Sequence, residues 1–239
     1  MIDMKNDIKN YELIDGLIKK LKDIENDFMG SDTYAVGGVL ENKFLYDRFV
    51  TIVNDNSKIN KSNSFLNYIK INYITSIIIA VCRQVDKNSD SVSLINFLEE
   101  IYSNADKITK KWFVSQYKTL GEEYSKKDFE ENFGSLTHVD PGIIYADIGK
   151  LLFYTKEIKK FRNKKVAHLD KNKKIKFDID FNILYKAIDL IEEIIKKYQL
   201  LLTQSWTAKL LPEKILSFRN DGSNEEDIFC VPWKNCKDI

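Results

Sequence analysis

The chain has 239 residues, 44% hydrophobic and 31% charged, and this length is sufficient for a sizeable buried core. Its nine glycines and three prolines are too few for collagen, for a disordered low-complexity chain or for a turn-dense β-sandwich. Basic and acidic residues nearly cancel, 37 against 36, which excludes a uniformly basic protein that coats nucleic acid but allows a local basic patch.

Helical periodicity dominates the sequence. We expect helices, in chain order, at 7–29, 39–54, 64–86, a short one capped by Ser91 or Ser93 and ending at Tyr102, and then at 106–120, 126–133, 140–165 and 180–203. The helix at 64–86 is apolar on nearly every face, which indicates a central, buried helix. Pro141 falls in the first turn of the helix at 140–165, where proline is well tolerated. The helix at 180–203 carries an apolar stripe that we expect to be buried: Leu184, Ala187, Ile188, Ile191, Ile194, Ile195, Tyr198, Leu201 and Leu202.

Strand signals are sparse, and Ile175–Ile179 is at most a short extended segment. The sequence therefore predicts an all-α protein, an antiparallel helical bundle. We expect N-terminal helices in 1–61 that pack on a helical core at 62–204, followed by an irregular tail at 205–239. Together these segments are expected to form one compact domain.

The three cysteines and two histidines have no spacing typical of a zinc site, so we expect free thiols, no metal site and no cofactor. Charged residues interrupt the first 21 positions before any apolar run, unlike a signal peptide. The longest apolar stretch, Ile77–Cys82, is far shorter than the roughly 20 residues of a membrane span. We expect a soluble, cytoplasmic protein that contacts no membrane.

A basic segment stands out between Lys156 and Lys176. It holds nine lysines and one arginine against two acidic residues, a local net charge of +8. Such a segment attracts phosphates over about a Debye length, roughly 8 Å at physiological salt. Charge alone leaves two interpretations open: a surface that binds nucleic acid, or a solvated lysine face balanced by the acidic residues at 225–227.

Arg162 lies inside this segment, at a position that the helix pattern marks as buried. The apolar stripe of the helix at 140–165 comprises Ile144, Ile148, Leu151, Thr155 and Ile158, and its next position is residue 162. A partly buried arginine must meet a partner or an anion. His168 follows six residues later, about 120° around an unbroken helix. Either the helix is distorted here, or the two side chains converge on a ligand from the edges of one groove, with help from a second subunit.

Arg162, Asn163 and His168 form the pattern R-N-x-x-x-x-H at the end of a long helix, and this pattern resembles the motif of the HEPN superfamily (higher eukaryotes and prokaryotes nucleotide-binding). The longer string F-R-N-K-K-V-A-H-L-D at 161–170 is similar to the abortive-infection branch of bacterial phage-defence proteins. The strings C-R-Q-V-D at 82–86 and S-V-S-L at 91–94 are similar to that branch too. The resemblance covers roughly residues 62–204 and implies a HEPN-like fold for this core.

The resemblance implies a metal-independent endoribonuclease that acts as a toxin in abortive infection or in a toxin–antitoxin system. It implies a homodimer in which both motifs face one cleft, with RNA as substrate and a cognate antitoxin as a possible partner. Arg162 and His168 are then the catalytic pair and Asn163 an auxiliary residue. The lysines expected to hold the RNA backbone are Lys159, Lys160, Lys164 and Lys165. The helix pattern has Lys159, Lys160 and Lys164 point away from the buried face.

Two other interpretations stay open. One is a non-catalytic HEPN-like module that binds nucleotide, RNA or a partner protein. The other is a purely structural helical protein in which Arg162 and His168 form a buried hydrogen-bonded pair. Separately, the i, i+3 spacing of Arg83 and Asp86 favours a structural ion pair.

Overall fold

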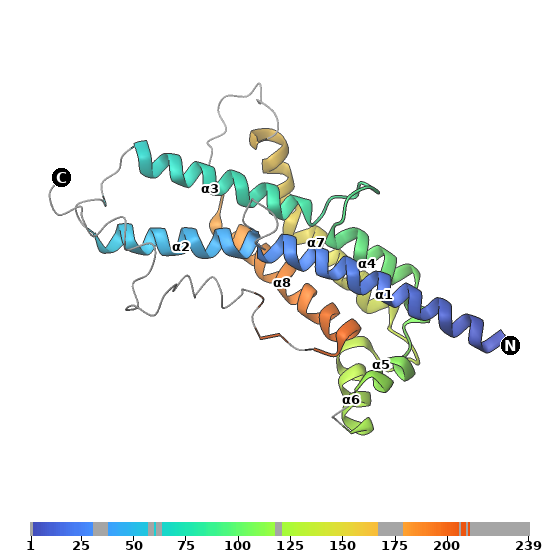
Figure 1. The fold of residues 1–239 in the computed structure, drawn as a ribbon. Coiled ribbons are helices and arrows are strands. Elements are labelled where there is room, and N and C mark those ends of the chain that lie inside the picture. Colours follow the sequence, from blue (N-terminus) through green and yellow to red (C-terminus); the bar gives the residue numbers. More distant parts are fainter. Residues whose placement is uncertain are drawn as a thin grey trace. The chain divides into compact units, whose positions relative to one another are not determined.

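The computed structural model describes residues 2–30, 38–56, 60, 64–117, 121–166, 179–205, 207–208 and 210, with side chains from residue 10 onward (Figure 1). The helices are α1 (Ile2–Met29), α2 (Val39–Asp55), α3 (Ser64–Arg83), α4 (Leu94–Ser103), α5 (Lys110–Gln116), α6 (Glu122–Phe133), α7 (Pro141–Phe161) and α8 (Phe181–Thr203). A 3-10 turn at Ala105–Lys107 and a π-helical turn at Arg162–Val166 complete them. The all-α prediction is confirmed, since the described residues contain no strand beyond an isolated bridge between Thr109 and His138.

Contacts group the described residues into two compact units. The first unit contains residues up to 26 together with 81–208, and residues 27–80 belong to the second. The unit boundaries thus fall inside α1 and α3. The division expected at residues 61 and 204 stays a prediction.

In the second unit, α2 and α3 are joined by an aromatic stack. The rings of Tyr46 and Tyr73 are parallel within 3°, with centroids 3.8 Å apart. The chain after α1 passes close to the start of α2, where Gly30 has φ +90°. A Cβ on Gly38 would lie only 2.0 Å from the Gly30 nitrogen, so glycine is required at this close approach.

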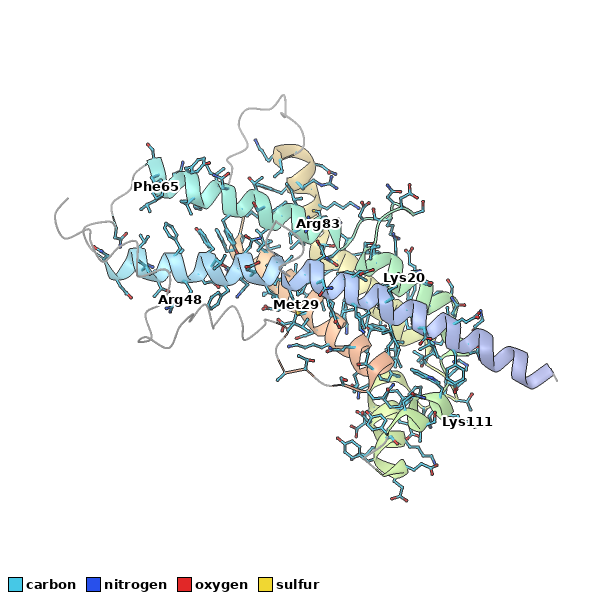
Figure 2. All side chains as sticks on the ribbon, viewed as in Figure 1. Lys20, Met29, Arg48, Phe65, Arg83 and Lys111 are labelled. Atoms are coloured by element: carbon cyan, nitrogen blue, oxygen red, sulfur yellow. The ribbon has the colours of Figure 1, made fainter. Side chains whose placement is uncertain are left out.

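The prediction for α3 is correct at its start and wrong in two respects. The helix ends at Arg83 rather than at residue 86, because the next residues form a turn in which the Gln84 and Val85 amides donate to carbonyls three residues back. The expectation that it is buried on nearly every face is also wrong, since apolar side chains along it are exposed: Phe65, Tyr68, Ile71 and Ile79. Phe65 marks the start of the helix and Arg83 its end in Figure 2.

The apolar length of α3 also exceeds the expectation drawn from the Ile77–Cys82 stretch. By length and composition alone, Ser64–Arg83 could cross a membrane. Core helices of soluble proteins have the same composition, and the expectation of no membrane contact stays a prediction.

The core of the first unit lies where α7 packs against α4 and α8. Every residue of the predicted α8 stripe is buried: Leu184, Ala187, Ile188, Ile191, Ile194, Ile195, Tyr198, Leu201 and Leu202. The ring of Tyr198 meets Phe97 of α4 edge-on at 6.0 Å. Side-chain caps begin these helices, as Asp140 accepts from the Gly142 amide at 2.7 Å and Ser93 from the Asn96 amide at 3.3 Å.

Helices α5 and α6 pack together beside the C-terminal end of α8 (Figure 1). Phe113, Phe129 and Phe133 form their shared aromatic core, with centroids 5.3–5.9 Å apart. The helix predicted at 106–120 is wrong at its start: α5 begins at Lys110, after Thr109 has accepted the Trp112 amide. The cause is a pairing distant in sequence, because the Val139 amide donates to the Ile108 carbonyl at 3.0 Å.

A buried carboxylate links α7 to α8. Asp147 accepts hydrogen bonds from the Lys197 ammonium at 2.6 Å and from the Tyr198 hydroxyl at 3.2 Å. Burial and the adjacent carboxylate raise the pKa of Tyr198 well above its usual value, so this hydroxyl stays a donor. Asp147 thus satisfies two polar groups of α8 that would otherwise be buried without an acceptor.

We predict that Asp147→Ala lowers the free energy of unfolding by about 3 kcal/mol, because it leaves a half-buried ammonium and a buried hydroxyl without their shared acceptor. Tyr198→Phe removes one neutral donor and is expected to lower it by about 1 kcal/mol. Urea unfolding measures both values. Asp189→Ala, on the exposed side of α8, is the matched control, and an equal loss in Asp147→Ala and Asp189→Ala would contradict this role.

Candidate functional site

The C-terminal end of α7 is not a regular helix. The Arg162 amide donates to the carbonyls of both Ile158 and Lys159, and a π-helical turn follows through Val166. Single π-helical turns are rare and occur frequently at functional sites. The helix is therefore distorted at the motif, which was one of the two expectations for Arg162 and His168. His168 itself lies outside the described residues.

Arg162 continues the buried face of α7, as predicted. Its side chain is half-buried, and its Nε is fully buried with no hydrogen-bond acceptor among the described residues. The guanidinium donates a hydrogen bond to the thiol of Cys82, at the end of α3. A sulfur acceptor satisfies a charged donor only weakly. The described residues around Arg162 therefore compensate its positive charge incompletely.

Two side chains from the C-terminal end of α3 and the loop after it face this charge. Burial raises the pKa of the Cys82 thiol, against the opposing effect of the Arg162 and Lys159 charges, so the thiol is neutral and cannot pair with the guanidinium as an anion. The pKa of Asp86 is held below its usual value, first by hydrogen bonds from the Asn88 amide and the Ser91 hydroxyl and then by the same two cations. Asp86 is thus an ionised carboxylate that interacts electrostatically with Arg162.

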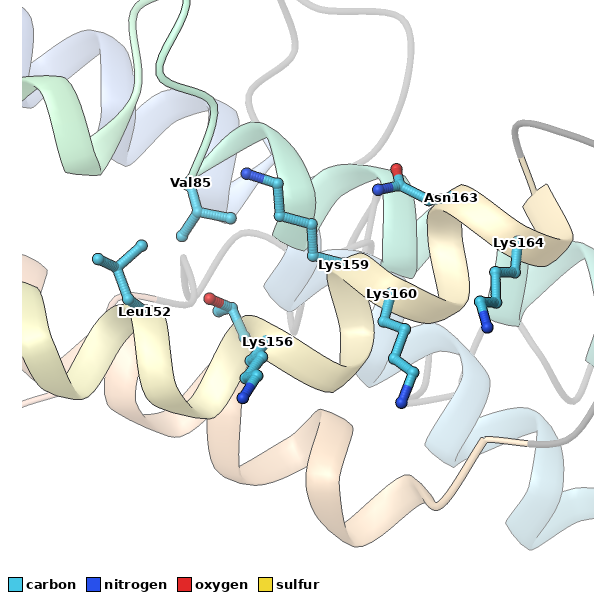
Figure 3. A pocket seen from close by; sticks show the side chains of 8 residues that line it. Val85, Leu152, Lys156, Lys159, Lys160, Asn163 and Lys164 are labelled. Atoms are coloured by element: carbon cyan, nitrogen blue, oxygen red, sulfur yellow. The ribbon is translucent and has the colours of Figure 1, made fainter.

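A pocket of about 450 Å³ lies along the outer side of α7 (Figure 3). Its lining combines lysines with small and apolar residues: Val85, Leu152, Thr155, Lys156, Lys159, Lys160, Asn163 and Lys164. Lys159 reaches toward Val85, with Asn163 on the same side of the helix. Lys156, Lys160 and Lys164 follow one another on the other side and are called the lysine row below.

Among the described residues, few acidic side chains neutralise the lysine row. Lys156 and Lys164 form no ion pair with any described residue, and Lys160 is 3.5 Å from Glu157 in a pair exposed at both ends. Such exposed pairs contribute little. The three ammonium groups stand at i, i+4 and i+8, where like charges repel by a few tenths of a kcal/mol per pair. A bound anion relieves this repulsion.

The structure brings most of the predicted site residues together. Lys159, Lys160, Lys164 and Asn163 line the pocket. Lys165 is half-buried in the π-helical turn and does not line it. The roles assigned to these residues in RNA binding and catalysis stay predictions.

The pair expected between Arg83 and Asp86 also stays a prediction. The Asp86 carboxylate accepts from the Asn88 amide at 3.2 Å and from the Ser91 hydroxyl at 2.9 Å. These bonds hold the loop that follows α3 rather than the helix itself.

Sequence analysis missed Lys156 as a site residue and Asp86 as a charge near the motif. Lys156 could have been found, because it stands one helical turn before Lys160 in the same row. The electrostatic effect of Asp86 on the motif could not have been found, because it depends on how the end of α3 packs against α7. The three-residue spacing from Arg83 suggested a partner within its own helix instead.

Comparison with known proteins gives one family match. The family model HEPN AbiU2, described as AbiU2, matches residues 40–221, which include α2 from its second residue, α3 to α8 and the whole R-N-x-x-x-x-H motif. A search of curated proteins and a search of solved structures gave no match. The match covers more than half of the chain and is wider than the region 62–204 on which the resemblance rested. The chain belongs to the HEPN AbiU2 family, an abortive-infection type of HEPN protein.

Proposed function

We propose that this protein is a metal-independent endoribonuclease that cleaves RNA with Arg162 and His168. The observation that carries the proposal is the position of Arg162, a positive charge at the distorted end of a helix whose neighbouring residues Lys159, Asn163 and Lys164 line a lysine-rich pocket. In this proposal the protein acts in the cytoplasm as a toxin of phage defence or of a toxin–antitoxin system. A cognate antitoxin would then be its natural partner.

The chemistry assigns one role to each motif residue. The RNA 2′-oxygen attacks the adjacent phosphorus, and the bond from phosphorus to the 5′-oxygen breaks. Histidine side chains can act as base or acid near neutral pH, and His168 moves the proton. Arg162 stabilises the charge that develops on the phosphate oxygens, and Asn163 orients the phosphate or the histidine. The products are a 2′,3′-cyclic phosphate and a free 5′-hydroxyl.

The surroundings of Arg162 suit this role. Guanidinium groups keep their proton throughout the physiological range, so its charge does not depend on pH. The neutral Cys82 thiol orients the group without cancelling its charge. Asp86 is tied to Asn88 and Ser91 and is not a competing bidentate partner.

We predict that Arg162→Ala and His168→Ala each lower RNA cleavage by at least about a hundredfold, since each removes a group that acts on the transition state. Purified protein is incubated with mixed RNAs in EDTA and the products are resolved on gels. Arg219→Ala and His138→Ala are matched controls, because Arg219 follows a phenylalanine and precedes an asparagine as Arg162 does.

Thermal melts show whether each variant is folded. Cleavage at the wild-type rate by folded Arg162→Ala and His168→Ala would overturn the active-site assignment. RNA binding by the wild type without any cleavage would instead support the non-catalytic HEPN-like module.

We predict that RNA affinity depends on the lysines at the end of α7 through phosphate contacts. Replacing Lys159, Lys160, Lys164 and Lys165 with glutamine should flatten the plot of log K against log salt by about 3, from a contribution of about 0.7 per neutralised phosphate of a single strand. The control with the same charge change replaces Lys107, Lys111, Lys126 and Lys127, which lie on or beside α5 and α6 and do not line the pocket. An unchanged slope in the first variant would show that these lysines do not contact RNA phosphates and that the segment is a solvated helix face.

We also propose that the protein is a homodimer whose two motifs share one cleft, with a two-fold axis near residue 165. An isologous contact there brings two arginines and two histidines to one phosphate. The +8 charge of each basic segment opposes this contact. We therefore predict that RNA strengthens the dimer, measured by light scattering with and without RNA. If the protein stays monomeric in both conditions and still cleaves RNA, the shared cleft is wrong and one motif is sufficient for cleavage.

A further inference from the structure

Aromatic side chains are exposed on the same outer side of α7 as the lysine row. Tyr145 is 67% exposed and Phe153 is 74% exposed, although both lie within a long helix of the core. Tyr102 of α4 is exposed as well, with its ring 6.3 Å from that of Tyr145. Single exposed aromatic residues are ordinary on soluble proteins, but a cluster beside a cationic row is a typical binding surface.

Helix geometry makes these groups neighbours. Leu152 and the lysine row occupy positions i, i+4, i+8 and i+12, and Tyr145, Gly149 and Phe153 occupy a second row at i, i+4 and i+8. The two rows are adjacent, because Phe153 precedes Lys156 by three residues, less than one turn of the helix. Rings and ammonium groups therefore form one continuous surface along α7.

The space between the two rings is open. Tyr145 and Phe153 are eight residues apart, about 12 Å along the helix axis. Gly149 lies between them, and a Cβ added there would meet no atom within 4 Å. The described part of the chain therefore leaves the surface at Gly149 open, so that flat groups can lie against the rings on either side of it.

We infer that this surface binds single-stranded RNA, with unpaired bases stacked on Tyr145 and Phe153 and backbone phosphates along the lysine row. The inference rests on the proposed function and names the form of RNA that the site takes. Successive residues of the row are about 6 Å apart along the helix axis, a spacing that suits consecutive phosphates of an extended strand. A duplex hides the faces of its bases, so it could use the lysines but not the rings.

The charge pattern favours RNA over an apolar protein partner. A protein surface that covered Phe153 would also cover Lys156, and it would have to remove an unpaired ammonium from water. A single strand supplies a flat π-face and an anion in each nucleotide, which matches a surface that combines aromatic rings with a row of ammonium groups.

The test measures binding by fluorescence anisotropy in the full-length His168→Ala protein, so that cleavage does not interfere. The probes are an unstructured 12-nucleotide RNA and a blunt RNA duplex of the same length. The double substitution of Tyr145 and Phe153 to alanine is expected to weaken binding of the single strand at least about tenfold and to leave the duplex within about twofold. Tyr145→Phe combined with Phe153→Tyr keeps both rings and should retain the affinity.

Tyr124→Ala on α6 is the matched control, since this tyrosine is 57% exposed and lies away from the pocket. Unchanged single-strand affinity in the double alanine variant overturns the stacking inference, and the proposed function stands if the wild type still cleaves RNA.

Equal losses of affinity for both probes also overturn the stacking inference, because they indicate a general effect on the surface. Loss of the dimer in light scattering with unchanged RNA affinity shows that the rings contact a second copy instead. Absence of both RNA binding and cleavage in the wild type removes the proposed function together with the inference.

Discussion

Arg162 places a permanent positive charge on the side of α7 that otherwise packs into the core of its unit. Burying a guanidinium is unfavourable unless acceptors surround it, and here the described acceptor is a neutral thiol, with Asp86 acting only through its charge. The helix must therefore be held in place by other contacts. Asp140 caps its start, and Asp147 joins its middle to Lys197 and Tyr198 of α8. These anchors let the last turn take up an irregular π-helical geometry.

The sequence predicted those features that depend on helical periodicity and local caps. The α8 stripe is buried as expected, Ser93 and Asp140 begin their helices, and Arg162 occupies the inner side of α7. These succeed because 3.6-residue periodicity and a side-chain cap need information from only one element.

Features that depend on contacts between elements could not be predicted in the same way. The late start of α5 follows from pairing of Ile108 with Val139, 31 residues later. From the sequence alone, Asp147 has the character of a surface residue, because its partner Lys197 is 50 residues away along the chain. Helix α3 has the apolar composition of a buried helix, although one side of it is exposed. Which of its side chains are buried could therefore be learned only from the structure.

In the proposed mechanism the two sides of α7 have different roles. Arg162, at the inner, distorted end, stabilises the charge on the reacting phosphate, and the outer rows of lysines and aromatic rings bind the RNA strand. The central claim is that RNA is cut by attack of its own 2′-oxygen. The most direct measurement uses an RNA that carries one 2′-deoxynucleotide immediately 5′ of a mapped cleavage site. We expect cleavage at that bond to disappear while binding and cleavage elsewhere continue, with cyclic phosphate ends at the remaining sites. Continued cleavage at the deoxy position would show that the nucleophile is not the 2′-hydroxyl and would contradict the mechanism.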